Sequence, residues 1–289
     1  MTFTARALVV LGFVSAGCFP PDEAGHPPSV APAEPVPGFR VVVPPPAPTP
    51  AAEPAARPPR RLLRPRRALR TRSGLRSWHP RVASRKPANG VARQVLAVVR
   101  RIESGLTRTR YQSVTRVRAK RGVYLWDCSG MADWILRRSA RGARRGLRKW
   151  RPLARDFYYA IARSPTKGQR RGWRRLKGPG DVRPGDLFAW LKPPIFRRRK
   201  NTGHVGFILS TPQPHPRHRN VWLMRVADAS RFRHEKDSRK AGGGGGFGTG
   251  IIAFQVQSGG RPVAYGWYGS LQSIATFVPT KIVFGRVTR

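Results

Sequence analysis

Two side chains in this sequence have the surroundings that a thiol nucleophile and its base require. Cys128 stands in Trp-Asp-Cys-Ser-Gly (126–130), directly ahead of apolar residues at helical spacing. Downstream, His204 opens a run of apolar residues with the composition of a strand. A cysteine at a helix N-terminus meets free backbone N–H groups and the positive end of the helix dipole, which favour the thiolate. With an imidazole beside it, such a thiolate can attack a carbonyl carbon, and the N–H groups can receive the oxyanion.

The elements that must position these residues follow a simple order, with helices first and strands afterwards. Apolar residues recur at helical spacing over 90–103, 128–138 and 151–163, and predict three amphipathic helices. Arg-Pro-Gly-Asp at 183–186 is turn chemistry and precedes a predicted strand at 187–190. This order predicts an α+β domain in which the helices pack on an antiparallel sheet. The remaining predicted strands are 204–209, 221–227, 250–256, 262–268 and 281–287.

Several polar groups of the sequence are not expected to carry chemistry. The loop 242–246 consists of glycine and is predicted to be flexible or to make close backbone contacts. It lacks the strand-to-helix context of a phosphate loop. His215, His218 and His234 lie in polar loops and are predicted to be surface residues. Without a second cysteine nearby or a cluster of carboxylates, we expect no metal site and no cofactor.

The chain is cationic along its whole length. Its 289 residues include 57 Lys and Arg against 13 Asp and Glu, for a net charge of +44. Residues 91–289 alone carry 43 basic and 9 acidic side chains, so the charge is not confined to a tail. Such a surface attracts polyanions, among them nucleic acid, anionic lipid headgroups and phosphate-bearing envelope polymers. No helix-turn-helix, zinc-finger or RNA-binding motif is present, so a specific nucleic-acid partner is not expected.

The N-terminus resembles an export signal over residues 1–18. Arg6 precedes an apolar run that is too short to span a bilayer, and small residues follow it. Ser-Ala-Gly-Cys at 15–18 resembles a bacterial lipoprotein box, which makes Cys18 a candidate for lipidation; ordinary secretion and an incidental apolar start are the alternatives. Lipidation or removal of Cys18 would leave Cys128 without a disulfide partner, so its thiol is either chemically needed or a small buried apolar group. We expect a location in the cell envelope, periplasmic or extracellular.

Residues 19–88 form a separate region rich in proline, alanine and arginine. Its few apolar residues show neither helical nor strand spacing, so a disordered tether is predicted. The basic second half, 57–86, is either a solvated linker or a segment that lies on an anionic surface. Residues 89–289 are then the folded domain, for which we expect a monomer.

Three motifs in this domain resemble those of the NlpC-type cell-wall cysteine peptidases, a papain-like superfamily that includes the CHAP amidases. They are Asp-Cys-Ser-Gly at 127–130, Pro-Gly-Asp-Leu at 184–187 and Gly-His-Val-Gly at 203–206. In that family the motifs open the core helix and the first two core strands. The resemblance covers roughly residues 90–289 and implies a papain-like fold.

The resemblance also implies roles for individual residues. Cys128 would be the nucleophile and His204 the general base. A polar residue on the strand after the histidine orients the imidazole, and Asp228 occupies that place, although family members often have His, Asn or Gln there. A family tyrosine upstream of the cysteine lines the oxyanion region, and Tyr111 and Tyr124 are the two candidates.

These residues also have structural interpretations. Ser129, which follows the nucleophile, is a further candidate for the oxyanion region or pocket. Asp127 is expected to cap the helix rather than to catalyse. His204 could instead be a strand-end histidine with a structural hydrogen bond, and Asp228 could cap a turn together with Ser230.

The sequence therefore predicts a secreted or lipid-anchored cysteine hydrolase. Its expected substrates are amide bonds of peptidoglycan stem peptides, cleaved through an acyl-enzyme on Cys128, and its basic surface would hold it against an anionic envelope polymer. One alternative is an acyltransferase or thioesterase of the same superfamily that acts on lipid or acyl substrates. Another is a cationic protein that binds nucleic acid or an envelope polymer and has an inactive site.

Overall fold

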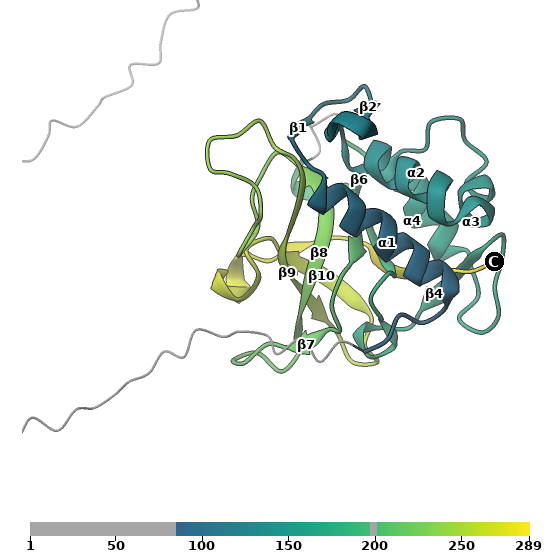
Figure 1. Cartoon of the computed structure of the whole chain (residues 1–289). Helices are drawn as coiled ribbons and strands as arrows, with labels where there is room; N and C mark the ends of the chain where they lie inside the picture. Colours follow the sequence, from purple (N-terminus) through teal and green to yellow (C-terminus); the bar gives the residue numbers. More distant parts are fainter. Residues whose placement is uncertain (1–84, 197–200) are drawn as a thin grey trace, which may run out of the picture. The chain divides into compact units, whose positions relative to one another are not determined.

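A computed structural model describes residues 85–196 and 201–289 of the chain. The predicted export signal, with Cys18, and nearly all of the predicted tether lie outside these residues. In the described part, the helices gather on one side of the strands (Figure 1). They are α1 (Gly90–Ser104), α2 (Cys128–Ser139), α3 (Arg141–Gly146) and α4 (Ala154–Ala162), with short 3-10 turns at Ala119–Arg121, Pro179–Asp181, Pro194–Phe196, Gly269–Leu271 and Ile274–Thr276.

The strands of the described residues form two sheets. In the three-stranded sheet, of order β1-β3-β2, β1 and β3 run parallel. The nine-stranded sheet has the order β11-β10-β9-β8-β6-β5-β12-β4, with β7 beside β8, and its paired strands are antiparallel. The strands are β1 (Arg108–Tyr111), β2 (Arg116–Arg118), β3 (Val123–Trp126), β4 (Trp173–Leu176), β5 (Leu187–Leu191), β6 (Gly203–Ile208), β7 (Gln213–Pro214), β8 (Val221–Ser230), β9 (Gly246–Val256), β10 (Pro262–Gly266), β11 (Val278–Pro279) and β12 (Ile282–Val287).

The three predicted helices are confirmed as α1, α2 and α4. Helix α4 begins three residues later than predicted, because Pro152 precedes it and the Asp156 carboxylate accepts the Leu153 N–H at 2.8 Å, which fixes the start. The six predicted strands correspond to β5, β6, β8, β9, β10 and β12. The short strands β1 to β4 were not predicted. Arginines alternate in β1 and β2 and stand side by side in β4, so these strands show no apolar face, and β3 is a run of only four residues.

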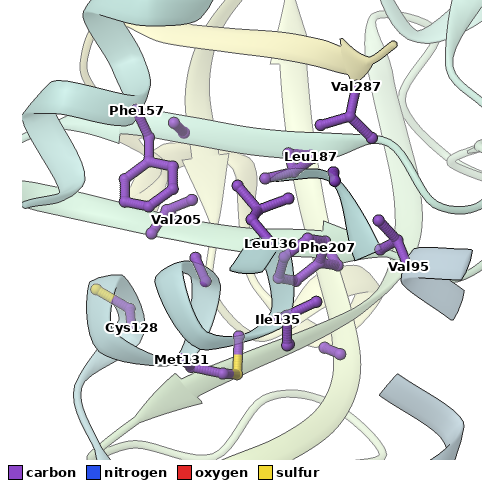
Figure 2. Packing of buried hydrophobic residues seen from close by; sticks show 14 of the residues in the cluster. Val95, Cys128, Met131, Ile135, Leu136, Phe157, Leu187, Val205, Phe207 and Val287 are labelled. Atoms are coloured by element: carbon purple, nitrogen blue, oxygen red, sulfur yellow. The ribbon is translucent and has the colours of Figure 1, made fainter. Parts of the chain in front are cut away.

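The core forms two layers because alternate residues of the central strands face opposite ways. Leu187 and Ala189 of β5 pack in the cluster that contains α1, α2 and α4, whereas Phe188 and Trp190 pack in a second cluster. Figure 2 shows the first cluster, in which helix side chains such as Leu136 lie next to strand side chains such as Leu187 and Phe207. Burial of each large apolar side chain stabilises the fold by about 1.5–3 kcal/mol. This packing fixes helix α2 against strand β6.

Two glycines allow β6 to lie where it does. Gly203 has φ of 132°, and a Cβ there would lie 1.9 Å from the carbonyl oxygen of Trp190. Gly206 permits close approach, since a Cβ would lie 2.6 Å from the Phe188 ring. Both glycines of the Gly-His-Val-Gly motif are thus explained by the packing of β6 on β5, and they set the position of His204 between them.

Candidate active site

Cys128 is the first residue of α2 and is buried, with 5% of its surface exposed. The Asp127 carboxylate caps the helix by accepting the Gly130 N–H at 2.7 Å and the Ser129 hydroxyl at 2.8 Å. The expectation that Asp127 is a cap is confirmed. Figure 2 places Cys128 at the end of the helix, at the margin of the packed cluster.

The cap also determines which backbone groups remain at the helix start. The Gly130 N–H is taken by Asp127, and the Met131 N–H donates to the Asp127 carbonyl at 3.0 Å. The N–H groups of Cys128 and Ser129 have no partner among the described residues. The Ser129 hydroxyl itself is engaged with Asp127, so its backbone N–H is the part of this residue that remains for an anion.

His204 joins Cys128 to Asp228. Its Nε2 lies 2.6 Å from Oδ2 of Asp228, and its side chain also hydrogen-bonds with Cys128. Since Nε2 is occupied by the carboxylate, Nδ1 is the ring nitrogen left for the thiol. The imidazole is enclosed by aromatic rings, with the Trp190 centroid 4.9 Å and the Trp267 centroid 5.5 Å away.

Opposing effects act on the charge of His204. Burial alone would lower the pKa of the imidazole, whereas the charge of Cys128 and the hydrogen bonds to Asp228 and Cys128 raise it. The outcome is a pKa of about 9, above the ordinary value of 6.5. The ring is therefore an imidazolium at neutral pH when Cys128 is a thiolate.

Asp228 is fully buried in β8, where its carboxylate lies beside His204, His234 and Arg239. Burial would raise the pKa of its carboxyl group, but the charges of His234 and Arg239 and the hydrogen bond with His204 hold the pKa well below its usual value. The alternative that Asp228 and Ser230 together cap a turn is wrong, because Ser230 alone accepts the Phe232 N–H at 2.9 Å.

The prediction that the three loop histidines are surface residues is wrong for His215 and His234, which are both 5% exposed. His234 lies in the connection between β8 and β9, with Nε2 3.2 Å from Asp228 Oδ2 and Nδ1 2.9 Å from Asp237 Oδ2. Arg239, from the same connection, forms an ion pair with Asp228. The burial of these residues was not predicted, because the sequence of a polar loop without periodicity does not indicate which of its side chains are buried.

Of the two candidate tyrosines, Tyr111 is the one that reaches the site. In the pairing of β1 with β3, Tyr111 stands opposite Trp126, two residues before Cys128. Burial and the charges of Cys128 and Asp127 raise the pKa of the Tyr111 phenol, so it is protonated at neutral pH. The guanidinium of Arg231 lies 5.4 Å from the centre of its ring.

Tyr124 is not brought to the site. Its ring packs in the core, 5.0 Å from the ring of Trp126 and 5.7 Å from that of Trp134. Arg138 is the charged group with the largest effect on its pKa, which burial raises. Trp134 and Arg138 belong to later turns of α2 than Cys128, so the proposed oxyanion role does not fit Tyr124.

The glycine-rich loop makes the close backbone contacts that were predicted as one of its two possible roles. The Gly244 carbonyl accepts the Tyr111 N–H at 3.0 Å, and a Cβ at Gly246 would lie 2.6 Å from the Arg110 nitrogen. The Thr109 hydroxyl accepts the Phe247 N–H at 2.8 Å. The loop thereby docks β1, and with it Tyr111, against β9.

The described residues, 85–196 and 201–289, show neither a metal site nor a membrane-spanning helix. No group of three His, Cys, Asp or Glu side chains in these ranges is arranged to hold a metal ion. No helix in them has the length and apolar character needed to cross a membrane.

Comparison with known proteins gives little further information. No family model and no solved structure matches the chain. The chain is 27% identical over 165 residues to an uncharacterized protein of Acanthamoeba polyphaga mimivirus, and the match covers 51% of this chain and 70% of that protein. The description of that protein names no activity, so a functional proposal must rest on the site itself.

Proposed function

We propose that the protein is a cysteine hydrolase that cleaves amide bonds through an acyl-enzyme on Cys128. The observation that carries this proposal is the buried chain of contacts from Cys128 through His204 to Asp228, assembled from α2, β6 and β8. An imidazole held between a thiol and a carboxylate is the arrangement that activates a nucleophile.

The chemistry proceeds in two halves. The Cys128 thiolate attacks the carbonyl carbon, and the oxyanion accepts hydrogen bonds from the N–H groups of Cys128 and Ser129 at the start of α2. The protonated phenol of Tyr111 is a further donor beside the nucleophile. His204 gives its proton to the leaving amine, and a thioester remains on Cys128. A water molecule then loses a proton to His204 and attacks the thioester, which releases the acid and restores the thiol.

For the substrate, we propose peptidoglycan stem peptides at a cell envelope. The support is the order of the three NlpC-type motifs and the cationic character of residues 91–289. A papain-like fold of NlpC type belongs to the same proposal. Location in the envelope, and a lipid anchor on Cys18, depend on residues 1–18, which lie outside the described part of the chain.

A second candidate function uses the same acyl-enzyme with a different acyl group. Aromatic rings enclose His204, and Trp267 is followed by Tyr268, which is 51% exposed. Phe232, four residues after Asp228, is 58% exposed. Such apolar surroundings would suit an acyl chain. The acceptor would be an alcohol or amine in a lipid acyltransferase and water in a thioesterase, and these two activities are the alternative.

The test compares the full chain with its Cys128→Ala variant on purified peptidoglycan sacculi, with released fragments identified by mass spectrometry. Stem-peptide fragments released by the wild type alone would support the proposal and identify the bond. Rapid alkylation of Cys128 without any release would exclude peptidoglycan and direct the search to acyl esters and thioesters. An inert thiol would contradict hydrolysis altogether and favour a polymer-binding role.

A further inference from the structure

The carboxylate of Asp228 has more partners than the orientation of one imidazole requires. Oδ2 lies 2.6 Å from His204 Nε2 and 3.2 Å from His234 Nε2, while Oδ1 pairs with the Arg239 guanidinium. The side chains of Asp228 and His234 are wholly buried, and that of Arg239 is 4% exposed. Each of these groups would be costly to bury alone, so they depend on one another.

The side chains beyond Asp228 form a closed set, which we call the Asp228 clamp: His234, Asp237 and Arg239. Asp237 lies 2.9 Å from His234 Nδ1 and pairs with the Arg239 guanidinium. Its carboxylate also accepts the backbone N–H groups of both His234 and Arg239, each at 2.7 Å. Arg239 further donates to the main-chain carbonyls of Asp228 and Gly246, each at 2.9 Å. The clamp is therefore fixed by backbone as well as side-chain contacts.

Strand β9 provides the space that the clamp occupies. Gly248 is the cross-strand partner of Asp228, and a Cβ there would lie 2.5 Å from the Arg239 side chain. A Cβ at Gly250 would lie 2.6 Å from that of His234. Two glycines at alternate positions on one face of β9 thus leave room for the side chains of His234 and Arg239.

We propose that His234 and Arg239 are positioning residues of the active site, which act through Asp228 to keep its carboxylate anionic and in the orientation that holds His204 against Cys128. This inference rests on the proposed function, because it gives the clamp a role in activating the Cys128 thiol. The charged and titratable groups in direct contact with the Asp228 carboxylate come from two places: His204 from β6, and His234 and Arg239 of the clamp from the β8–β9 connection.

A clamp that works in this way has a specific consequence for substitutions. If His234 and Arg239 act through Asp228, their removal has no further effect once the carboxylate is gone. Arg239→Gln in the wild-type background should slow alkylation of Cys128 by at least about tenfold, but in the Asp228→Asn background by less than about twofold. Residues that merely stabilise the fold would instead give effects that add.

The readout is the rate of iodoacetamide alkylation of Cys128 at neutral pH, relative to the urea-unfolded chain. Peptide mass spectrometry of the full-length protein separates Cys128 from Cys18, and no substrate is needed. His234→Gln should behave as Arg239→Gln does, and Arg239→Lys should recover part of the rate, because it retains the charge. His215→Gln, which alters the other buried loop histidine, is the matched control and should leave the rate unchanged.

Folding is checked by circular dichroism for each variant. If Arg239→Gln does not fold, the same cycle is completed with Arg239→Lys and His234→Gln, which retain more of the contacts. Folded variants with wild-type rates, or effects that add to those of Asp228→Asn, would overturn the proposed role of the clamp. A wild-type thiol no more reactive than in the unfolded chain would overturn the proposed function itself, which separates the two failures. Reactivity that depends on the clamp, in a protein that leaves sacculi intact, would support the clamp and contradict only the substrate.

Discussion

The candidate site depends on the protonation state of His204, which is determined by opposing effects on the pKa of its imidazole. Burial disfavours the imidazolium, yet the charge of Cys128 and the carboxylate of Asp228 outweigh this effect, and the pKa rises to about 9. Among the groups that raise it, Cys128 has the largest effect. The charge of His204 is therefore a property of the pair rather than of the imidazole alone.

The first prediction concerns this coupling. Cys128→Ser removes the largest effect that raises the pKa of His204, so that pKa should fall from about 9 toward or below 6.5. The measurement is an NMR titration of the histidine ring carbons, with His204 assigned by substitution. Cys18→Ser is the control and should leave the titration unchanged, whereas an unchanged pKa in Cys128→Ser would show that the thiol does not reach the ring.

The raised pKa of His204 also determines how the stability of the protein changes with pH. A folded-state pKa above 6.5 contributes stability that is fully present below pH 6.5 and is lost as the pH rises through about 9. The free energy of unfolding of the wild type should therefore decrease across this interval. In Cys128→Ser the decrease should be smaller, since the folded and unfolded pKa values of His204 become closer.

The sequence predicted the position of a residue correctly where its immediate neighbours determine its place in a helix or strand. Cys128 follows a capping aspartate, and His204 stands between glycines at a strand start, so both positions were predictable. His234 and Arg239 were not, because their burial results from a loop that folds back on β8. One signal was present in Gly248 and Gly250, whose spacing on a strand indicates that bulky groups cover them.

Among the elements, the three-stranded sheet supplies a side chain, Tyr111, that neither the helices nor the nine-stranded sheet can bring to the site. Strand β1 brings Tyr111 beside Cys128 through its parallel pairing with β3, which leads directly into α2. Neither strand was predicted, since each has four residues and β1 reads Arg-Thr-Arg-Tyr, without an apolar face. Strands β5, β6 and β8 were predicted because their continuous apolar runs match strands buried on both faces.

The second prediction concerns the start of β6. Gly203→Ala should destabilise the protein by about 1–3 kcal/mol, because φ of 132° is strained for alanine, and the Trp190 carbonyl occupies the space of the new Cβ. Urea unfolding measures this change. Because β6 must shift to relieve the contact, alkylation of Cys128 at neutral pH should also slow.

Gly180→Ala is the matched control for this substitution. Gly180 has no neighbouring atom within 4 Å of a new Cβ, and its φ is not positive, so both stability and alkylation should stay at wild-type values. Equal effects of the two substitutions would mean that the position of β6 does not depend on Gly203.

The whole molecule is cationic because its 57 basic residues far outnumber its 13 acidic ones, and several of the acidic side chains are paired internally. Of the 9 acidic side chains in residues 91–289, three form buried ion pairs: Asp186 with Arg286, and Asp228 and Asp237 with Arg239. These carboxylates face their own arginine partners rather than the exposed basic side chains. The net charge of +44, which already counts every carboxylate, attracts a polyanion at long range.

The third prediction follows from this charge. The chain should bind long-chain polyphosphate with an affinity that falls by about a thousandfold or more between about 50 and 200 mM salt, because binding releases counterions from the polymer. Fluorescence anisotropy over a salt series measures the dependence. Cys128→Ala should bind equally well, and weak or salt-independent binding would show that the charge does not serve a polyanionic partner.

The partners of Asp228 also differ in how far along the chain they stand from it. Arg239 is 11 residues away, on the β8–β9 hairpin, and His204 is 24 residues away, whereas the Phe247–Thr109 bond that docks β1 spans 138 residues. Because shorter loops close at a smaller entropic cost, we expect the hairpin with its ion pairs to form early in folding and β1 to dock late. Pulse-labelled hydrogen exchange would resolve this order. A newly synthesised chain would then complete the carboxylate end of its site before Tyr111 is brought toward the nucleophile, so an intermediate on the folding path would still lack this oxyanion donor.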